Sequence, residues 1–198
     1  SWVKSLGTSV NVGFTSSITI DSVMNIYFTG HFYDSLDCDP GSGVFNIYSS
    51  GDEDVFVEKL DQNGNFLWAK SFGGKLTDIG NDVKIGNSGN VYVATCFSDT
   101  ADFDPTLGIS TQISKGSFDC GLLKLNSMGN LIWIKTFGGI GWDQCPSIVL
   151  DESENVFSTG RFSDTVDFDP GTGVYDLISE GSDIYVLKLD SSGNFIWV

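Results

Sequence analysis

Three closely similar phrases decide the fold: WVKSLG at residues 2–7, WAKSFGG at 68–74 and WIKTFGG at 133–139. The tryptophans that open them, together with Trp197, are spaced 66, 65 and 64 residues apart. A fixed period of this length indicates a repeat architecture in which each copy is one supersecondary unit. The sequence therefore predicts three tandem copies of a unit of about 65 residues.

Each copy contains the same pieces between its tryptophans. In the third copy, residues 148–173 read IVLDESENVFSTGRFSDTVDFDPGTG and residues 183–197 read DIYVLKLDSSGNFIW. Alternating β-branched and aromatic residues between Gly, Asn, Asp and Ser clusters predict short strands and tight turns. Helix formers are scarce, with three Ala and three Gln in the chain. In the first copy the strands are expected near 18–21, 25–32, 54–60 and 65–72.

Four antiparallel strands per copy describe one blade of a β-propeller. The predicted fold class is thus all-β, with tandem four-stranded antiparallel blades in a β-propeller-like arrangement. Because the chain begins and ends in the same kind of outer strand, the N-terminal strand is expected to complete a neighbouring blade. The predicted repeats are 1–67, 68–132 and 133–198.

Two kinds of hairpin turn recur in the copies. The phrases DQNGN, NSMGN and DSSGN place Gly64, Gly129 and Gly193 where a hairpin loop needs a positive φ. The other turn has glycine only in the second copy, and Met24 and Glu154 stand at that position elsewhere. We expect those two turns to be built differently or to carry strain.

Three blades are fewer than closure requires, since closed propellers have about four to eight. The chain is either an excerpt of a longer propeller, or a protomer of which two make six blades, or an open array. Exposed edge strands at the two ends would otherwise invite pairing with another chain. We favour an excerpt or an assembly over an isolated monomer, so the expected partners are further blades or other copies of the chain.

Charge and composition exclude several function classes. A net charge of −16 with ten Lys and Arg would repel the phosphates of a nucleic acid and an anionic membrane surface. No apolar run approaches the roughly 20 residues that span a bilayer. The sequence has no initiator Met and no leader pattern, so a mature or excised piece is expected, without membrane insertion.

An Asp-rich segment recurs in every copy and is the most prominent polar feature. In an extended D-x-D stretch the two carboxylates project to one side, and hard oxygen ligands of this kind suit calcium. The alternative is that the acids cap turns and the following proline ends the strand. The candidate calcium ligands are Asp34, Asp37, Asp39, Asp99, Asp102, Asp104, Asp164, Asp167 and Asp169.

Other repeated side chains favour structural roles. The lysines at 59, 124 and 188 share one phase and are expected on the solvent side of a strand, paired with a carboxylate. The aromatic residues are expected between blades, although exposed aromatic rings can also stack on sugars. The four cysteines fit no zinc pattern, and both buried thiols and two disulfides are open.

No catalytic constellation is evident. His31 is the only histidine, and no GxSxG motif, phosphate-binding loop or dinucleotide fingerprint accompanies it. Paired acids could serve a glycosidase, but the same acids recur three times, whereas an active site is normally assembled once from unlike residues. The sequence therefore predicts a protein that is not an enzyme and has no certain cofactor.

The phrases GRFSDTVDFDPGTG (160–173), DIYVLKLDSSGNFIW (183–197) and WAKSFGG (68–74) resemble the bacterial SBBP-type β-propeller repeat. The resemblance covers essentially the whole chain. It departs at Cys38, where the other copies have Phe103 and Phe168, and the glycine that follows this proline in the other copies is absent after Pro105.

That resemblance implies export to the surface of a bacterial cell or secretion, with a scaffold or adhesive role and no catalytic residues. The predicted function is a non-enzymatic extracellular structural or adhesive module, able to self-assemble into an oligomer or filament by strand completion between chains. The alternative is a carbohydrate-binding propeller, either with or without a need for calcium. A glycoside-cleaving enzyme is a third and weaker hypothesis.

Overall fold

The computed structural model describes residues 2–7 and 13–198, and within these ranges it contains fourteen strands and no helix. The all-β prediction is confirmed. The strands are β1 (Phe14–Ile20), β2 (Ile26–Asp37), β3 (Asn46–Leu60), β4 (Phe66–Gly74), β5 (Asp78–Ile85), β6 (Val91–Phe97), β7 (Thr100–Asp102), β8 (Thr111–Ile113), β9 (Asp119–Leu125), β10 (Leu131–Phe137), β11 (Gln144–Leu150), β12 (Val156–Asp167), β13 (Asp176–Leu189) and β14 (Phe195–Trp197).

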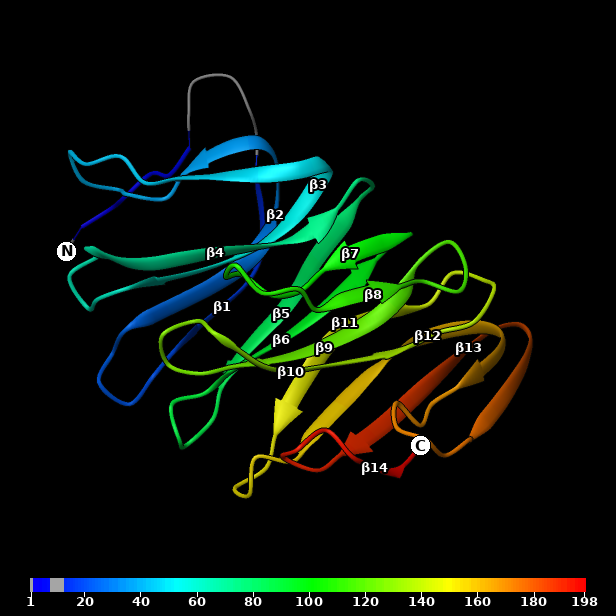
Figure 1. Cartoon of the computed structure of the whole chain (residues 1–198). Helices are drawn as coiled ribbons and strands as arrows, with labels where there is room; N and C mark the ends of the chain where they lie inside the picture. The colour runs from blue at the N-terminus through cyan, green and yellow to red at the C-terminus, as the bar shows by residue number, and fades with distance from the viewer. Residues whose placement is uncertain (1, 8–12) are drawn as a thin grey trace.

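The strands form three antiparallel sheets that follow one another along the chain (Figure 1). The first sheet has the order β1-β2-β3-β4, the second β5-β6-β9-β10 and the third β11-β12-β13-β14. The hairpin β7-β8 of the second copy joins the end of β4, which extends the first sheet to six strands. Each copy thus contributes a four-stranded meander, and the outer strand of a sheet carries the phrase that opens the next copy.

Two hairpins are longer than the sequence predicts. We expected the second strand to end near residue 32, but β2 continues to Asp37 and β3 begins at Asn46. A shift in register between Tyr33 and Ser35 lets the strand bend and pair again. The third sheet has the same extension, whereas in the second copy residues 98 and 99 lie outside the strands and the extension forms the separate hairpin β7-β8.

The glycine turns are formed as predicted. Gly64, Gly129 and Gly193 have φ values of 76°, 79° and 80°. The expectation that Met24 and Glu154 build a different turn is wrong, because both donate a backbone hydrogen bond across the turn as Gly89 does. The expected strain is present, since Met24 and Glu154 have φ values of 66° and 61°.

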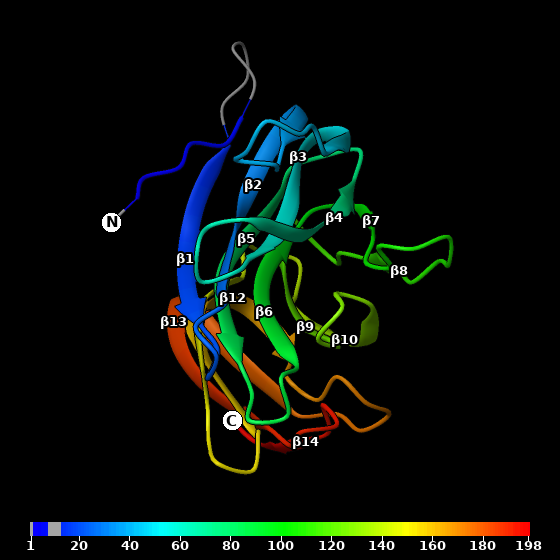
Figure 2. The same ribbon diagram turned by 90° about the vertical axis from the view of Figure 1, so that its left-hand side faces the viewer.

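The sheets pack face to face, with β5 against strands β1, β2 and β3 on one side (Figure 2) and against β11 on the other. Buried side chains form one cluster between the first and second sheets and another between the second and third. A third cluster lies on the first sheet and includes Leu6 from the N-terminal segment. In the part of the chain that the structure describes, no helix could cross a membrane.

Candidate functional site

The faces between successive sheets hold the repeated chemistry of the molecule. At the first junction, Val55 and Val57 of β3 pack with Val83, Val91 and Leu125 of the second sheet. The second junction repeats this packing at the equivalent positions. Cys120 and Leu122 of β9 pack there with Ile148, Val156 and Leu189 of the third sheet. One face of a copy therefore fits the opposite face of the next.

The outer strands of the first two sheets also reach across to the following copy. Gly73 at the end of β4 pairs with Asp102, and Gly138 after β10 pairs with Asp167. The indole nitrogen of Trp68 donates to the carbonyl of Ser127 at 3.2 Å, in the glycine turn of the next sheet. Trp133 makes the same bond to Ser191 at 3.3 Å, so the repeated tryptophans link neighbouring sheets.

The N-terminal segment 2–7 lies on the first sheet in the same way. The amide of Gly7 donates to the carbonyl of Asp37 at 3.1 Å, which repeats the contacts of Gly73 and Gly138. The ring of Trp2 lies 3.0 Å from the position that a Cβ on Gly64 would take, in the glycine turn of this sheet. The segment thus occupies the place of an outer strand from a preceding sheet.

Pairs of buried carboxyl groups accompany each junction. Asp54 of β3 and Asp78 of β5 both lie within 2.8 Å of the position that a Cβ on Gly73 would take. Asp54 accepts a hydrogen bond from the Ser50 amide, and its Oδ1 has no partner among the described residues. Burial raises the pKa of Asp54 to about 6 and, with the charge of Asp54 adding to it, the pKa of Asp78 to about 8.

The second junction repeats this pair with Asp119 and Asp143. Asp119 crowds Gly138 as Asp54 crowds Gly73, and the Gly139 amide donates to Asp143 at 2.7 Å. Burial, together with the charge of Asp143, raises the pKa of Asp119 to about 6. We did not predict these pairs from the sequence, although Asp54 and Asp119 recur at the same phase.

One further carboxylate connects all three sheets. Asp82 of β5 accepts hydrogen bonds from the hydroxyl of Ser17 at 2.6 Å and from the hydroxyl of Ser147 at 3.2 Å, and it pairs with Lys84. It also accepts the Ile148 amide at 2.9 Å. Burial alone would raise the pKa of Asp82, but these bonds outweigh it and hold the pKa below its usual value. Ser17, Asp82 and Ser147 occupy equivalent positions of the three copies. The acid at a position where the other copies have serine is the sequence signal that we missed.

The Asp-rich segments use their carboxylates inside their own loops. Asp37 Oδ1 accepts the amides of Asp39 and Phe45 at 3.1 and 2.9 Å, and Asp39 Oδ1 accepts that of Gly41 at 2.8 Å. The other copies repeat these bonds at Asp102 and Asp104 and at Asp167 and Asp169.

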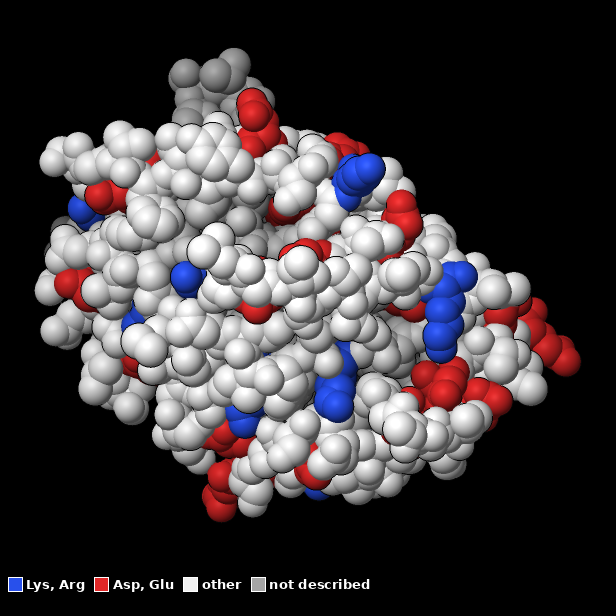
Figure 3. All heavy atoms as spheres, viewed as in Figure 1, with Lys and Arg blue, Asp and Glu red and all other residues white. Residues whose placement is uncertain are grey.

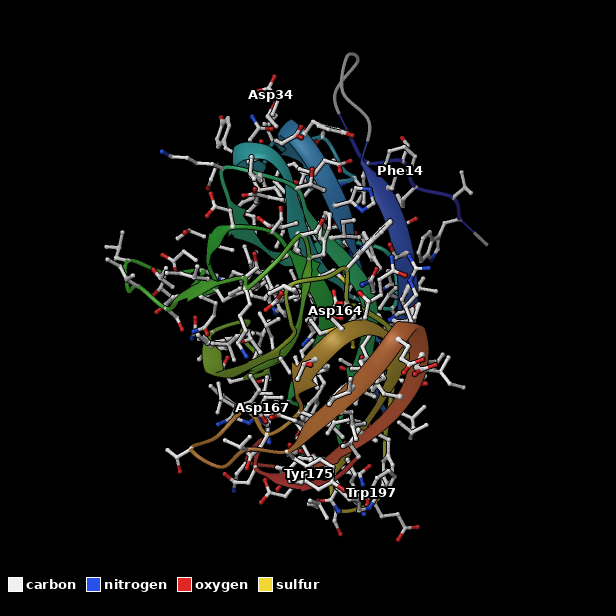
Figure 4. The ribbon with its side chains drawn as sticks, turned by 90° about the vertical axis from the view of Figure 1, so that its right-hand side faces the viewer. Phe14, Asp34, Asp164, Asp167, Tyr175 and Trp197 are labelled. Atoms are coloured by element: carbon white, nitrogen blue, oxygen red, sulfur yellow. The ribbon has the colours of Figure 1, made fainter. Side chains whose placement is uncertain are left out.

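The first acid of each segment differs from the other two in its backbone conformation. Asp34, Asp99 and Asp164 adopt left-handed backbones with φ of 57°, 57° and 61°, which Asp tolerates better than most residues. Figure 4 shows Asp34 and Asp164 at separate places on the first and third sheets. Within the described ranges, no three His, Cys, Asp or Glu side chains are grouped so that they could hold a metal. The calcium assignment stays a prediction.

The repeated lysines lie over aromatic rings. Lys59 and Lys124 are 4.9 Å from the ring centres of Tyr27 and Tyr92, and Lys188 is 4.6 Å from that of Phe157. These contacts cross between neighbouring strands and add a cation–π attraction to the sheet. Two of the three lysines also lie near a carboxylate, Lys124 at 3.7 Å from Glu154 and Lys188 at 3.7 Å from Asp151, but both acids belong to the turn between β11 and β12 and not to a neighbouring strand. The expected solvent-facing position is wrong for Lys124, which is buried.

The cysteines are free and buried, so of the two alternatives the structure has thiols. Cys96 and Cys120 face each other across β6 and β9, and the Cys145 amide donates to Cys96 at the second junction. His31 is also largely buried, 3.5 Å from Glu53, and burial lowers the pKa of its imidazole. The cysteines and His31 therefore lie within or beside the packed faces of the sheets.

The two ends of the array leave part of each junction face uncovered, although Phe28 and Leu60 of the first sheet are buried. On the first sheet, Ile18 is 69% exposed, whereas the equivalent Val83 and Ile148 are 0% and 1% exposed. On the third sheet, Ile184 and Val186 are 85% and 50% exposed, although their equivalents in the other sheets are buried. These two faces are the candidate functional surfaces of the chain.

Comparisons with known proteins agree with a repeat protein and assign no activity. No family model matches. The chain is 25% identical over 224 aligned residues to an uncharacterized WD repeat-containing protein, L264, of Acanthamoeba polyphaga mimivirus. The match covers the whole of this chain and 16% of that protein, so the chain spans about a sixth of its relative's length.

A search of solved structures finds a Bacteroides caccae protein of unknown function. It has 11% sequence identity and a TM-score of 0.31, and the match covers 93% of this chain and 81% of the other.

Proposed function

We propose that the chain is a non-enzymatic structural module of a β-propeller-like array, exported by a bacterium and placed outside the cell or on its surface. The observation that carries this proposal is the repetition of each junction. The same positions supply the apolar face, the tryptophan bond and the glycine crossing in successive sheets. Repetition of this kind builds a rigid scaffold of similar units, in which each unit contacts its neighbours.

The distribution of polar groups supports a scaffold over an enzyme. Asp82 connects inner strands, the buried acids Asp54, Asp78 and Asp119 flank glycine crossings, and the loop acids cap turns. On the face drawn in Figure 3, acidic and basic side chains lie in small separate groups among uncharged residues. An extracellular location follows the resemblance to the SBBP-type repeat.

A tandem fusion tests the proposal. Joining Val198 directly to Lys4 of a second copy restores the phrase WVKSLG and keeps the period. The fusion gains one junction, so we expect its urea midpoint to exceed that of the single chain. The matched control carries Ile184→Asp in the first copy, which should remove the gain. An identical midpoint in chain, fusion and control would contradict the scaffold, and electron microscopy of the fusion would separate a closed ring from an open array.

A glycan-binding role is the second candidate, and one hollow favours it. An open cavity of about 560 Å³ between the first two sheets is lined by Phe118, the acids Asp52 and Asp99, and several hydroxyl groups. An aromatic ring beside acids and hydroxyls suits a sugar, and calcium would strengthen such binding through the loop acids. A glycan array with and without calcium tests this role, with Phe118→Ala as the variant that should lose the hits. An array without hits in either condition removes it.

A further inference from the structure

We infer that a second copy of this chain docks head to tail, with the uncovered face of β13 seated in a groove on the first sheet and residues 4–7 completing the open edge of β13. This inference rests on the proposed function and names the partner of its two end surfaces.

The groove on the first sheet is apolar and of a definite size. Its volume is about 360 Å³, and it lies between the N-terminal segment and strands β1 and β2. The apolar residues of β1, β2 and β3 that line it are Ile18, Ile26, Phe28 and Leu60. The opposite wall includes Trp2 and Leu6.

The internal junctions identify what fits this groove. One repeat later, the four lining positions are Val83, Val91, Val93 and Leu125, which are all fully buried. In the first junction they pack with Val55 and Val57 of the preceding sheet. The residues of the third sheet that are equivalent to those two valines are Ile184 and Val186, which are exposed. The chain thus carries both the groove and its matching ridge, at opposite ends.

Backbone pairing gives the same answer. The outer strand β4 pairs with β3 from Val55 to Leu60, and β10 pairs with β9 from Cys120 to Leu125. In contrast, β14 pairs with β13 only at Lys188 and Leu189, among the described residues. The stretch 184–187 of β13 therefore presents an unpaired edge, which is a template for another strand.

The N-terminal segment has the sequence and the position to fill this edge. Lys4 and Leu6 are equivalent to Lys70 and Phe72, which pair with Val57 and Val55. In the docked pair, Lys4 of one copy would lie opposite Val186 of the other, and Leu6 would lie opposite Ile184. The Gly7 bond to Asp37 already holds the segment on its own first sheet, so docking needs no rearrangement of residues 4–7.

The two tryptophans at the ends set the length of the shared strand. Trp2 and Trp197 occupy equivalent positions, and only one of them can pack on the glycine turn of the first sheet. Trp2 and Val3 are exposed, so we expect them to leave this position when Trp197 of the other copy packs there. Deletion of residues 1–3 should leave association intact, whereas deletion of 1–7 should abolish it.

Light scattering across a concentration series of the full chain tests the inference. Ile184→Asp and Ile18→Asp each place a charge on one uncovered face, and Leu107→Asp is the matched control on an exposed loop. These side chains are exposed, so each variant should keep the circular dichroism spectrum and midpoint of the unmutated monomer. We expect each face variant to weaken self-association at least ~10-fold, while Leu107→Asp does not.

A mixture of the two face variants gives the sharper result. Each retains one intact face, so the head-to-tail geometry predicts a complex of one Ile184→Asp chain with one Ile18→Asp chain and no growth beyond it. A wild-type chain that stays monomeric at every concentration would overturn the inference, and so would association that all three variants share. A monomeric chain whose tandem fusion gains stability would leave the proposed scaffold standing.

Discussion

Leu122 and Val186 occupy the same position of two successive repeats, and they differ in what covers them. Leu122 is buried between the second and third sheets, whereas Val186 lies on the uncovered face of the third. Figure 4 shows Phe14 of the first sheet and Trp197 of the third sheet near opposite ends of the molecule. The contrast shows that the same local sequence contributes to the core only where a neighbouring sheet is present.

The largest expected effect comes from alanine substitutions at this position, made once in the covered repeat and once in the uncovered one. Leu122→Ala should destabilise the chain by about 2–5 kcal/mol because it leaves a cavity in a closed junction. Val186→Ala should change the free energy of unfolding by less than about 0.5 kcal/mol, since solvent already reaches that side chain. Urea unfolding at concentrations where the chain is monomeric measures both, and equal losses would remove the distinction between covered and open faces.

The pH dependence of stability should come from the buried acids, which are those of the covered junctions and also Glu58 of β3, whose pKa is raised to about 8 by burial. The pKa values of Asp54, Asp78 and Asp119 are raised above the unfolded value of 3.8, so the native state holds protons that the unfolded chain has released. Their contribution to stability is fully present below about pH 4 and is lost as the pH rises through their folded pKa values. We expect the free energy of unfolding to fall by a few kcal/mol between about pH 4.5 and pH 8, because each tenfold difference in proton affinity between the two states is worth about 1.4 kcal/mol.

The matched variants locate this pH dependence. Asp54→Asn and Asp119→Asn remove a titrating group from a junction and should flatten the profile. Asp183 holds the equivalent position in the third copy but is exposed at the open end, so Asp183→Asn should leave the slope as it is. A profile that rises over this pH range, or one that Asp183→Asn flattens as much, would contradict the junction as its source.

Much of this architecture could be predicted from the sequence, because its signals are local. The tryptophan period, the alternating strands and the glycine turns each depend on residues close together in the chain. The long hairpins were missed because their extension requires Asp34 and Asp164 to adopt left-handed backbones, and the same acids also suit a calcium loop. An Asp-rich phrase alone does not distinguish these two uses.

The junction chemistry could not be predicted, since it depends on residues from different copies. Asp54 and Asp78 meet only when two sheets pack across Gly73. Asp82 stands where the other copies have serine, and only the packed inner strands show that the three positions touch. A comparison of equal phases could have marked the odd acid, but the packing was needed to show its role.

Asp82 provides an intermediate effect within the covered region. Asp82→Ala leaves Ser17, Ser147 and the Ile148 amide without their acceptor at the inner strands, and buried polar groups without partners cost about 1–3 kcal/mol. Asp82→Ser, which restores the residue type of the other copies, should recover part of that loss. Thermal unfolding of the two variants decides this, and an Asp82→Ala chain as stable as the wild type would show that the shared carboxylate does not link the sheets.

The smallest effects concern two strained turns that differ in their neighbours. Met24 and Glu154 have the same left-handed backbone, which glycine adopts without steric cost. Met24 is exposed, so Met24→Gly should stabilise the chain by about 1 kcal/mol. Glu154, however, accepts bonds from the amide and hydroxyl of Ser88 and from the hydroxyl of Tyr92 in the preceding sheet. Glu154→Gly relieves the same strain but loses those bonds, so the net change should be destabilising. Differential scanning calorimetry should show a stability change of opposite sign in the two variants if the strained backbone at Glu154 is kept for its contact with the neighbouring sheet. Stabilisation by both substitutions would show that this contact contributes less than the strain costs.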